Sequence, residues 1–316
     1  MFAQRLVFGS LMIAAVIGTV VLDVWLSTPG GVGQAAGCLP MAGLPVTLLL
    51  TLLVVLGTFE MGRVCRAGGY LPATLWAAFV AAGLVLAPWV EMQARVGRAN
   101  PLFDTTLRQL SPTVVWLAGG ILGAALVMLA RRTTERALGN IAVTVLMFAY
   151  LGLLGSFLIR IRCLSPGLEG ALLAAYVVLT IKSGDIGAYL TGMAIGRHKL
   201  APWVSPAKTV EGAAGAVLLA VVVALAGMAA WPELVGGVHG PLTTSQAIVF
   251  GIVMAVVGHL GDLVESAIKR DVRVKDSGYL VPAFGGLLDL LDSPLFAAPA
   301  AWAALTFWCG VDYNYP

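Results

Sequence analysis

The densest group of charged side chains lies near the end of the chain, in the stretch from position 262 to position 292. The whole sequence holds 19 lysines and arginines and 16 aspartates and glutamates. Ten of these residues fall in this stretch: Asp262, Glu265, Lys269, Arg270, Asp271, Arg273, Lys275, Asp276, Asp289 and Asp292. Carboxylates are ligands of Mg²⁺, while lysine and arginine bind phosphate groups. A connection between two helices needs neither, so this composition favours a site for a metal ion and a phosphorylated ligand.

Spacing places several of these residues on one face of a predicted helix. The run GHLGDLVESAIKRD is helical in character. Asp262, Glu265 or Ser266, Lys269 and, just beyond the run, Arg273 follow one another at intervals of three and four residues, which is the spacing of one helix face. Acids and bases therefore share one stripe.

Two interpretations of this stripe compete. The first is a solvated helix end whose bases contact anionic lipid head groups, with about 1 kcal/mol for each base. The second is an active site in which Asp262 and Asp289 hold a divalent cation, because two carboxylates together with substrate phosphates are the usual ligands of Mg²⁺. A carboxylate within a membrane span is unfavourable by about 2.5–3.5 kcal/mol, which favours the second interpretation.

A second polar patch occupies the stretch KSGDIGAYLTGMAIGRHKLAPWVSPAKTVEG. Asp185 lies within an apolar helix, and Ser205, Lys208 and Thr209 supply donors just before the next helix. The amides at a helix N-terminus attract anions, so this loop is a candidate phosphate site. The alternative is an ordinary capped helix start, with Ser205 or Thr209 as the cap and Glu211 in the first turn. The motifs of P-loop and dinucleotide-binding proteins are absent from the sequence.

Apolar segments long enough to cross a bilayer must position these residues. Hydrophobic residues make up 59% of the sequence, charged residues 11%, and the mean hydropathy is +0.93, whereas soluble domains carry roughly 25% charged residues. Nine segments of about 20 residues are expected to span as helices: 5–26, 42–60, 71–90, 112–130, 138–158, 168–190, 209–231, 245–268 and 283–311. We therefore predict an all-α polytopic membrane protein. Helices at 1–165 and 166–316 are expected to form one continuous membrane domain, with the site in the second group.

Features of the first segment and the cysteines allow further expectations. The run 5–26 resembles a signal peptide, and Cys38 hints at a lipoprotein cleavage site, but the run is long enough for a retained helix. The four cysteines lie far apart, which predicts free thiols.

Small residues at Gly184, Gly187, Gly192 and Gly196 form a stripe that suits close internal packing and a homodimer contact equally well. A net charge of only +3 predicts no nucleic-acid partner.

The distribution of lysine and arginine between the spans predicts the orientation, because positively charged loops stay cytoplasmic. The N-terminus and the even-numbered loops hold 13 of the 19 basic residues, and the opposite face holds five. The N-terminus and both polar patches are thus expected on the cytoplasmic side of a bacterial-type plasma membrane.

Taken together, these motifs resemble the phosphatidate cytidylyltransferase family, also called CDP-diglyceride synthases. The resemblance covers residues 182–293 and rests on GAYLTG, HKLAP, SPAKTVEG, GDLVESAIKRDVRVKD and FGGLLDLLDS. The family's S-x-x-K-R-x4-K-D element is matched by Ser266, Lys269, Arg270, Lys275 and Asp276, and its closing G-G-x-x-D-x-x-D by Gly285, Gly286, Asp289 and Asp292. This chain departs from the family at Phe284 (usually histidine), Leu290 (usually arginine) and Val281.

The resemblance implies transfer of a cytidylyl group from CTP to phosphatidate or a related lipid phosphate within the membrane. It implies Mg²⁺, with room for a second cation, held by Asp262 and Asp289. The implied catalytic residues are Asp262, Asp289, Lys269 and Lys275. The implied substrate-binding residues are Ser205, Lys208, Thr209, Ser266, Arg270, Asp276, Asp292 and Asp185.

Other functions stay open at this stage. Phe284 and Leu290 leave room for a relative that acts on another lipid phosphate, or that binds lipid without turnover. A transporter could use Asp23, Glu60, Lys182 and Asp185 as an ion path, but the chain shows no internal repeat. His198 and His259 are expected to support the site through hydrogen bonds rather than to act as general bases.

Overall fold

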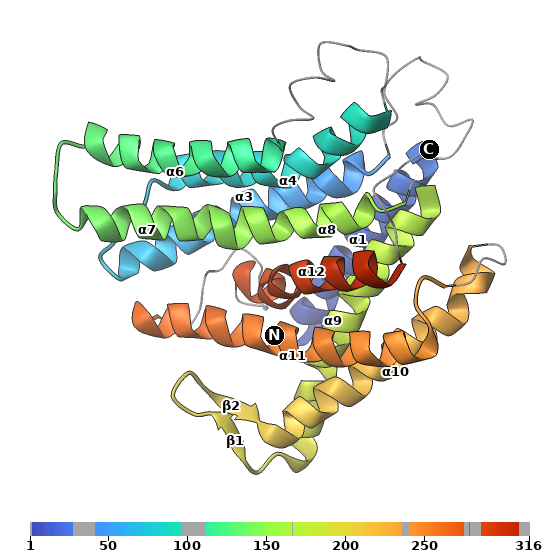
Figure 1. The fold of residues 1–316 in the computed structure, drawn as a ribbon. Coiled ribbons are helices and arrows are strands. Elements are labelled where there is room, and N and C mark those ends of the chain that lie inside the picture. The colour runs from blue at the N-terminus through green and yellow to red at the C-terminus, as the bar shows by residue number, and fades with distance from the viewer. Residues whose placement is uncertain are drawn as a thin grey trace. The chain divides into compact units, whose positions relative to one another are not determined.

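The computed structural model describes residues 2–27, 42–96, 111–165, 167–235, 240–274, 278 and 286–309 (Figure 1). Apart from one short hairpin, these residues form helices. The elements are α1 (Phe2–Ser27), α3 (Leu44–Ala67), α4 (Thr74–Val96), α6 (Pro112–Ala130), α7 (Ala137–Phe148), η1 (Ala149–Leu153), α8 (Leu154–Arg162), α9 (Gly167–Ile195), β1 (Lys199–Ala201), β2 (Ser205–Thr209), α10 (Val210–Leu234), α11 (Thr244–Asp271) and α12 (Leu288–Cys309).

The predicted membrane helices are confirmed. Within the described residues, eight helical segments are long and apolar enough to cross a membrane, with α7, η1 and α8 together forming one of them. They coincide with the expected segments from 42–60 onwards. The first expected span, 5–26, is also helical in α1, and its described apolar part runs from Ala14 to Leu26. The protein is therefore an all-α polytopic integral membrane protein.

The chain divides into two compact units. The first comprises Met1–Ala171 and Asp271–Leu290, and the second comprises Leu172–Arg270 and Leu291–Asn314. The division falls close to the expected boundary at 165/166, but the segment 271–290 returns to the first unit. That the two groups of helices form one continuous membrane domain stays a prediction.

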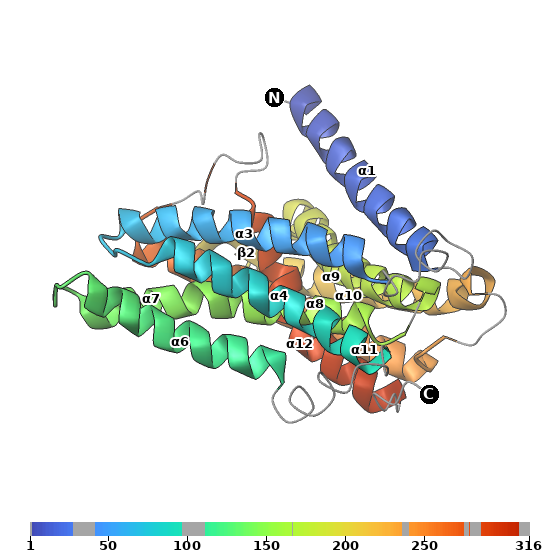
Figure 2. The same ribbon diagram turned by 90° about the horizontal axis from the view of Figure 1, so that it is seen from above.

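In the first unit, α4 is the central helix. It contacts α3, α6, α7 and α8, and these helices run alongside one another in both views (Figures 1 and 2). The outward face of α6 is apolar. Leu122, Leu126 and Leu129 are exposed there at the spacing of one helix face. An apolar stripe of this kind suits lipid tails, because they solvate leucine as well as a protein core does.

One wide turn interrupts the span at 137–162. The π-helix η1 lies between α7 and α8, and an inserted π turn of this kind shifts the register of the helix face. Gly152 in this turn lies against α4, where an added Cβ would come 2.6 Å from the Cα of Ala81. The π turn therefore sits where two backbones approach closely.

Two acidic residues of the first unit pair with arginines. Asp23 of α1 and Arg162 of α8 are both fully buried, with 2.6 Å between Asp23 Oδ2 and Arg162 Nε. Glu91 of α4 accepts a hydrogen bond from Ser111 and lies 3.1 Å from Arg160. These pairs fasten α1 to α8 and α4 to α8.

The two cysteines with described side chains, Cys65 and Cys163, are buried free thiols, as predicted. Burial raises the pKa of the Cys163 thiol to about 12, which keeps it protonated and unreactive near neutral pH. Cys38 and the side chain of Cys309 lie outside the described residues.

In the second unit, the glycine stripe of α9 packs against α10. An added Cβ at Gly187 would lie 2.4 Å from the Gly215 carbonyl oxygen, and one at Gly196 would lie 2.8 Å from the hydroxyl of Thr209. On α10, an added Cβ at Gly215 would lie 2.0 Å from the Thr191 hydroxyl. The stripe thus serves internal packing, and the homodimer contact stays a prediction.

We expect Gly187→Ala to destabilise the protein by about 1–3 kcal/mol, because the new methyl group would collide with backbone rather than with a movable side chain. Gly119→Ala on α6 is the matched control, since an added Cβ there has no neighbour within 4 Å. Alanine is the better helix former, so the control should be neutral or slightly stabilising. Melting temperatures in detergent measure both, and equal values for the two variants would contradict the packing argument.

Candidate active site

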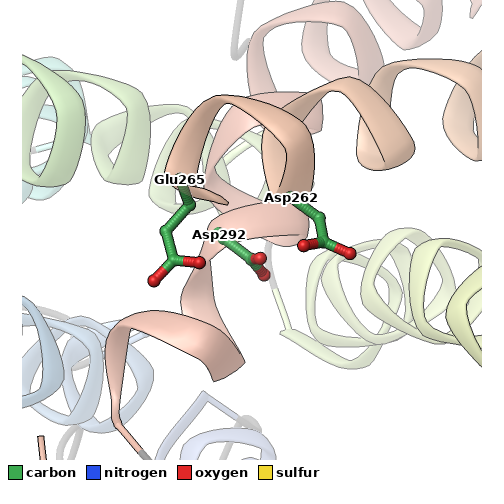
Figure 3. Close-up of side chains that lie close together, drawn as sticks. All are labelled: Asp262, Glu265 and Asp292. Atoms are coloured by element: carbon green, nitrogen blue, oxygen red, sulfur yellow. The ribbon is translucent and has the colours of Figure 1, made fainter. Parts of the chain in front are cut away.

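Two helices of the second unit bring three carboxylates together. Asp262 and Glu265 lie one turn apart on α11, and Asp292 lies on α12 (Figure 3). Gly261 allows this approach, because an added Cβ there would lie 2.8 Å from the Asp292 carbonyl oxygen and 2.6 Å from the Cβ of Phe296. The small residue next to Asp262 therefore sets the distance between the two acidic segments.

The three carboxylates form a compact cluster. One oxygen of each lies within 4.8 Å of the others. Glu265 and Asp292 are buried, whereas the Asp262 side chain is 37% exposed. Like charges at this separation repel strongly in a medium of low dielectric constant, so nearby cations stabilise the ionised cluster. An all-oxygen donor set of this kind could hold a hard divalent cation.

Two lysines flank the cluster. Lys208 Nζ lies 2.7 Å from Asp262 Oδ2 and donates to the carbonyl oxygen of His259 at 3.4 Å. Lys269 Nζ lies 2.8 Å from Glu265 Oε2, one turn along α11. The ammonium groups therefore neutralise part of the negative charge, while Asp262 stays partly exposed and the Lys208 side chain is only 13% exposed.

Lys208 reaches this position from a hairpin that the sequence did not predict. Strands β1 and β2 pair antiparallel, with Lys199 opposite Thr209. Of the two residues expected as caps, Thr209 is the N-cap of α10. Its hydroxyl accepts a hydrogen bond from the amide of Gly212 at 3.1 Å. Because β2 runs directly into the capped helix, the backbone beside Lys208 is fixed at one end.

Glu211 closes the base of the hairpin. Its carboxylate accepts from the backbone amides of Arg197 and His198 and lies 2.6 Å from the imidazole Nδ1 of His198. The opposite strand end is thereby tied to the first turn of α10. His198 is engaged in this structural contact, in agreement with its expected supporting role.

Further polar contacts extend from the cluster to α9. The Ser293 amide donates to Asp292 Oδ1 at 2.6 Å, and the Ser293 hydroxyl donates to Asp185 Oδ1 at 3.4 Å. Asp185 in turn pairs with Lys182 at 2.9 Å. Asp185 therefore lies in the same network as Asp292, although its residue type alone could not indicate a partner.

The other predicted residues have different surroundings. Arg270 is exposed and donates to the carbonyl oxygen of Val204 in the hairpin at 3.3 Å, while Ser205 begins β2 and Ser266 is half-buried on α11. Asp289 lies in the first turn of α12, where its Oδ2 accepts from the amide of Gly286 at 3.0 Å. Lys275 and Asp276, like Val281 and Phe284, lie outside the described residues.

Two members of the network have no role predicted from the sequence. Glu265 lies on the predicted acidic stripe and is the third carboxylate of the cluster. Its spacing of three from Asp262 and four from Lys269 was the available signal. The only sequence signal for Ser293 is its position next to Asp292.

The charges that suggested an ion path have protein partners instead. Asp23 pairs with Arg162, and Lys182 pairs with Asp185. Glu60 accepts hydrogen bonds from two backbone amides at the start of α12. These contacts account for the four residues without a transport role.

Membrane-spanning helices that carry a carboxylate cluster between two lysines define an integral membrane protein with a site suited to cations and phosphorylated ligands. Comparison with known proteins specifies which kind. The chain belongs to the cytidylyltransferase family, whose model matches residues 3–308.

Individual relatives agree with this assignment. The chain is 39% identical over 159 residues to the phosphatidate cytidylyltransferase of Bacillus subtilis strain 168. The aligned region covers 50% of this chain and 56% of the relative. It is 37% identical over 136 residues to that of Mycobacterium bovis, covering 41% and 40%. The uncharacterized protein YnbB of Escherichia coli K12 is 42% identical over 140 residues, covering 44% of each chain. The match spans about half the length of these curated relatives.

Proposed function

We propose that this protein transfers a cytidylyl group from CTP to phosphatidate, which yields CDP-diacylglycerol and pyrophosphate. One observation carries the proposal: residues from separate predicted motifs, Lys208 on the hairpin, Asp262 on α11 and Asp292 on α12, meet in one cluster. The phosphatidate cytidylyltransferases among the relatives support the choice of substrates.

The reaction is a displacement at phosphorus. An oxygen of the lipid phosphate forms a bond to the α-phosphorus of CTP, and the bond from that phosphorus to the oxygen bridging to the β-phosphate breaks, so pyrophosphate leaves. Both reactants are anions, so the main barrier is their repulsion, and positioning with charge neutralisation lowers it. Lipid phosphate is itself the nucleophile, so the protein need not form a covalent intermediate.

Basic residues around the cluster would neutralise the reacting phosphates. Lys208 has its ammonium group 2.7 Å from the partly exposed carboxylate of Asp262. Lys269, Arg270 and Lys275 would act with it on the triphosphate and the lipid phosphate. Ser205, Thr209 and Ser266 would donate hydrogen bonds, while Asp185 and Asp276 would orient the bases.

The acidic residues fit a magnesium ion by the chemistry of their donors. Three carboxylates offer oxygen atoms within 4.8 Å of one another, and hard oxygen ligands suit Mg²⁺. Bound there, the ion would act as a Lewis acid on the phosphate oxygens. We propose Asp262 and Asp289 as its ligands, with Asp292 and Glu265 as further ligands or as holders of a second cation.

We further propose that the site faces the cytoplasm across a bacterial plasma membrane. The excess of lysine and arginine in the N-terminal segment and the even-numbered loops supports this orientation. CTP is a cytosolic nucleotide, whereas the acyl chains of phosphatidate lie in the bilayer. The reacting phosphates must therefore meet at the inner interface.

Radiolabelled CTP incubated with membranes that contain the protein and with phosphatidate tests the proposal. We expect a labelled CDP-lipid that forms only when Mg²⁺ is present and disappears when EDTA removes it. Membranes without the protein provide the background. A labelled product that forms equally well in EDTA would contradict the metal requirement, and absence of any product with phosphatidate would contradict the proposed acceptor.

Two substitutions favour a second candidate function. Leu290 on α12 and Phe284 replace an arginine and a histidine that the family pattern carries, and both lost groups could bind phosphate. A different lipid phosphate as acceptor, or lipid binding without turnover, would follow from their loss. Product formed only with another lipid phosphate in the same assay would favour the former, and no product with any acceptor the latter.

A further inference from the structure

A buried carboxylate of the first unit contacts the beginning of α12. Glu60 of α3 has no exposed surface. Its Oε2 accepts hydrogen bonds from the backbone amides of Leu287 at 2.6 Å and Leu288 at 3.0 Å. Amides at a helix start have no partner within the helix and carry the positive end of its dipole. Glu60 thus supplies from another helix an acceptor for two amides at the start of α12.

These amides belong to the turn that precedes Asp289. The backbone amide of Gly286 donates a hydrogen bond to Asp289 Oδ2, so the carboxylate of Asp289 folds back over this turn. The next two amides of the same turn donate to Glu60. Two charge-assisted contacts to consecutive amides fix both the position and the direction of a peptide segment. The orientation of the Asp289 side chain therefore depends on the buried glutamate.

Gly278 lies against the other oxygen of the Glu60 carboxylate. An added Cβ at position 278 would lie 1.9 Å from Glu60 Oε1 and 2.7 Å from its Cδ. Because Glu60 Oε2 is held by two amides, the carboxylate cannot yield to such a group without losing them. A glycine at this point is therefore a requirement of the contact between α3 and α12.

We propose that Glu60 is a positioning residue, which holds the first turn of α12 so that Asp289 presents its carboxylate to the metal ion. The inference rests on the metal site proposed above. Glu60 lies more than 200 residues before Asp289 in the sequence, and it acts through the backbone rather than by touching substrate. Partners that orient the ligands of a metal site typically contribute roughly 10–100-fold to metal affinity.

The test is direct metal binding by the purified full-length protein in detergent. Mn²⁺ is the probe, because it accepts the same oxygen ligands as Mg²⁺ and its free concentration is measured by electron paramagnetic resonance. We expect Glu60→Gln to weaken Mn²⁺ binding by about 10–100-fold, because the neutral oxygen of glutamine accepts the two backbone hydrogen bonds more weakly than the charged carboxylate oxygen does. The same variant should need correspondingly more Mg²⁺ for half-maximal turnover.

Gly278→Ala is the second variant, because it displaces the Glu60 carboxylate without removing any charge, and it should weaken Mn²⁺ binding in the same range. Glu91→Gln is the matched control: this glutamate is also largely buried in the first unit, but it pairs with Arg160. The control should lower the melting temperature and leave Mn²⁺ binding unchanged.

The outcomes separate the two proposals. No Mn²⁺ binding by the wild-type protein would overturn the metal site itself. Wild-type binding that is unchanged in Glu60→Gln and Gly278→Ala would overturn the positioning role alone. Loss of folding in both variants would show that Glu60 stabilises the fold rather than orienting Asp289, and would also overturn the positioning role.

Discussion

Asparagine in place of Asp262 or Asp289 should reduce cytidylyl transfer by more than about a hundredfold while the protein still folds and inserts. Each change removes the negative charge of a proposed metal ligand but keeps the size of the side chain. Loss of a residue that merely orients a metal ligand lowers activity roughly 10–100-fold, so loss of a ligand should exceed this. Asp262→Asn also removes the partner of Lys208, which lies 2.7 Å away.

The measurement is incorporation of labelled CTP into lipid, with protein levels and melting temperatures determined in parallel. Asp271→Asn is the matched control, since Asp271 ends α11 with an exposed side chain and the same charge is lost. It should retain near wild-type activity. Turnover that survives in Asp289→Asn would place the cation on Asp262, Glu265 and Asp292 instead.

Breaking the buried pair between Asp23 and Arg162 should produce the largest loss of stability. Arg162→Met leaves the fully buried Asp23 carboxylate without its guanidinium partner, and an uncompensated buried charge destabilises by about 3–5 kcal/mol. The melting temperature in detergent should fall well below that of the wild type. The matched control is Arg132→Met, because Arg132 is an exposed arginine of the loop between α6 and α7.

A double variant tests the pairing directly. Replacing both partners with apolar residues leaves no unpaired buried charge, and such replacements are often neutral or stabilising for the fold. We therefore expect Asp23→Leu combined with Arg162→Met to recover most of the stability lost in the single variant. Additive losses in the double variant would show that the two residues act separately.

The membrane helices could be predicted from sequence because their signal is local. Each span needs about 20 consecutive apolar residues, and nothing distant alters that count. The expected span 112–130 coincides with α6, and 209–231 differs from α10 by a few residues. The π turn at Ala149–Leu153 escaped prediction, because it depends on close packing against Ala81 rather than on composition.

The hairpin and the composition of the cluster depend on contacts between distant segments. SPAKT was expected to lead into a capped helix, and Thr209 does cap α10, but pairing with Lys199–Ala201 turns the segment into a strand. The acidic stripe contained Asp262 and Glu265, whereas Asp292 joins them only because Gly261 admits α12. The roles of Asp289, Lys275 and the remaining site residues stay predictions.

The contact between Glu60 and the start of α12 also bears on the order of biogenesis. Glu60 enters the membrane early in synthesis, but the amides that it accepts from are made 227 and 228 residues later. Until then these two hydrogen bonds cannot form. Helix α12 would thus complete this part of the fold, and a chain interrupted before it would leave the buried Glu60 without the two amides that it accepts hydrogen bonds from.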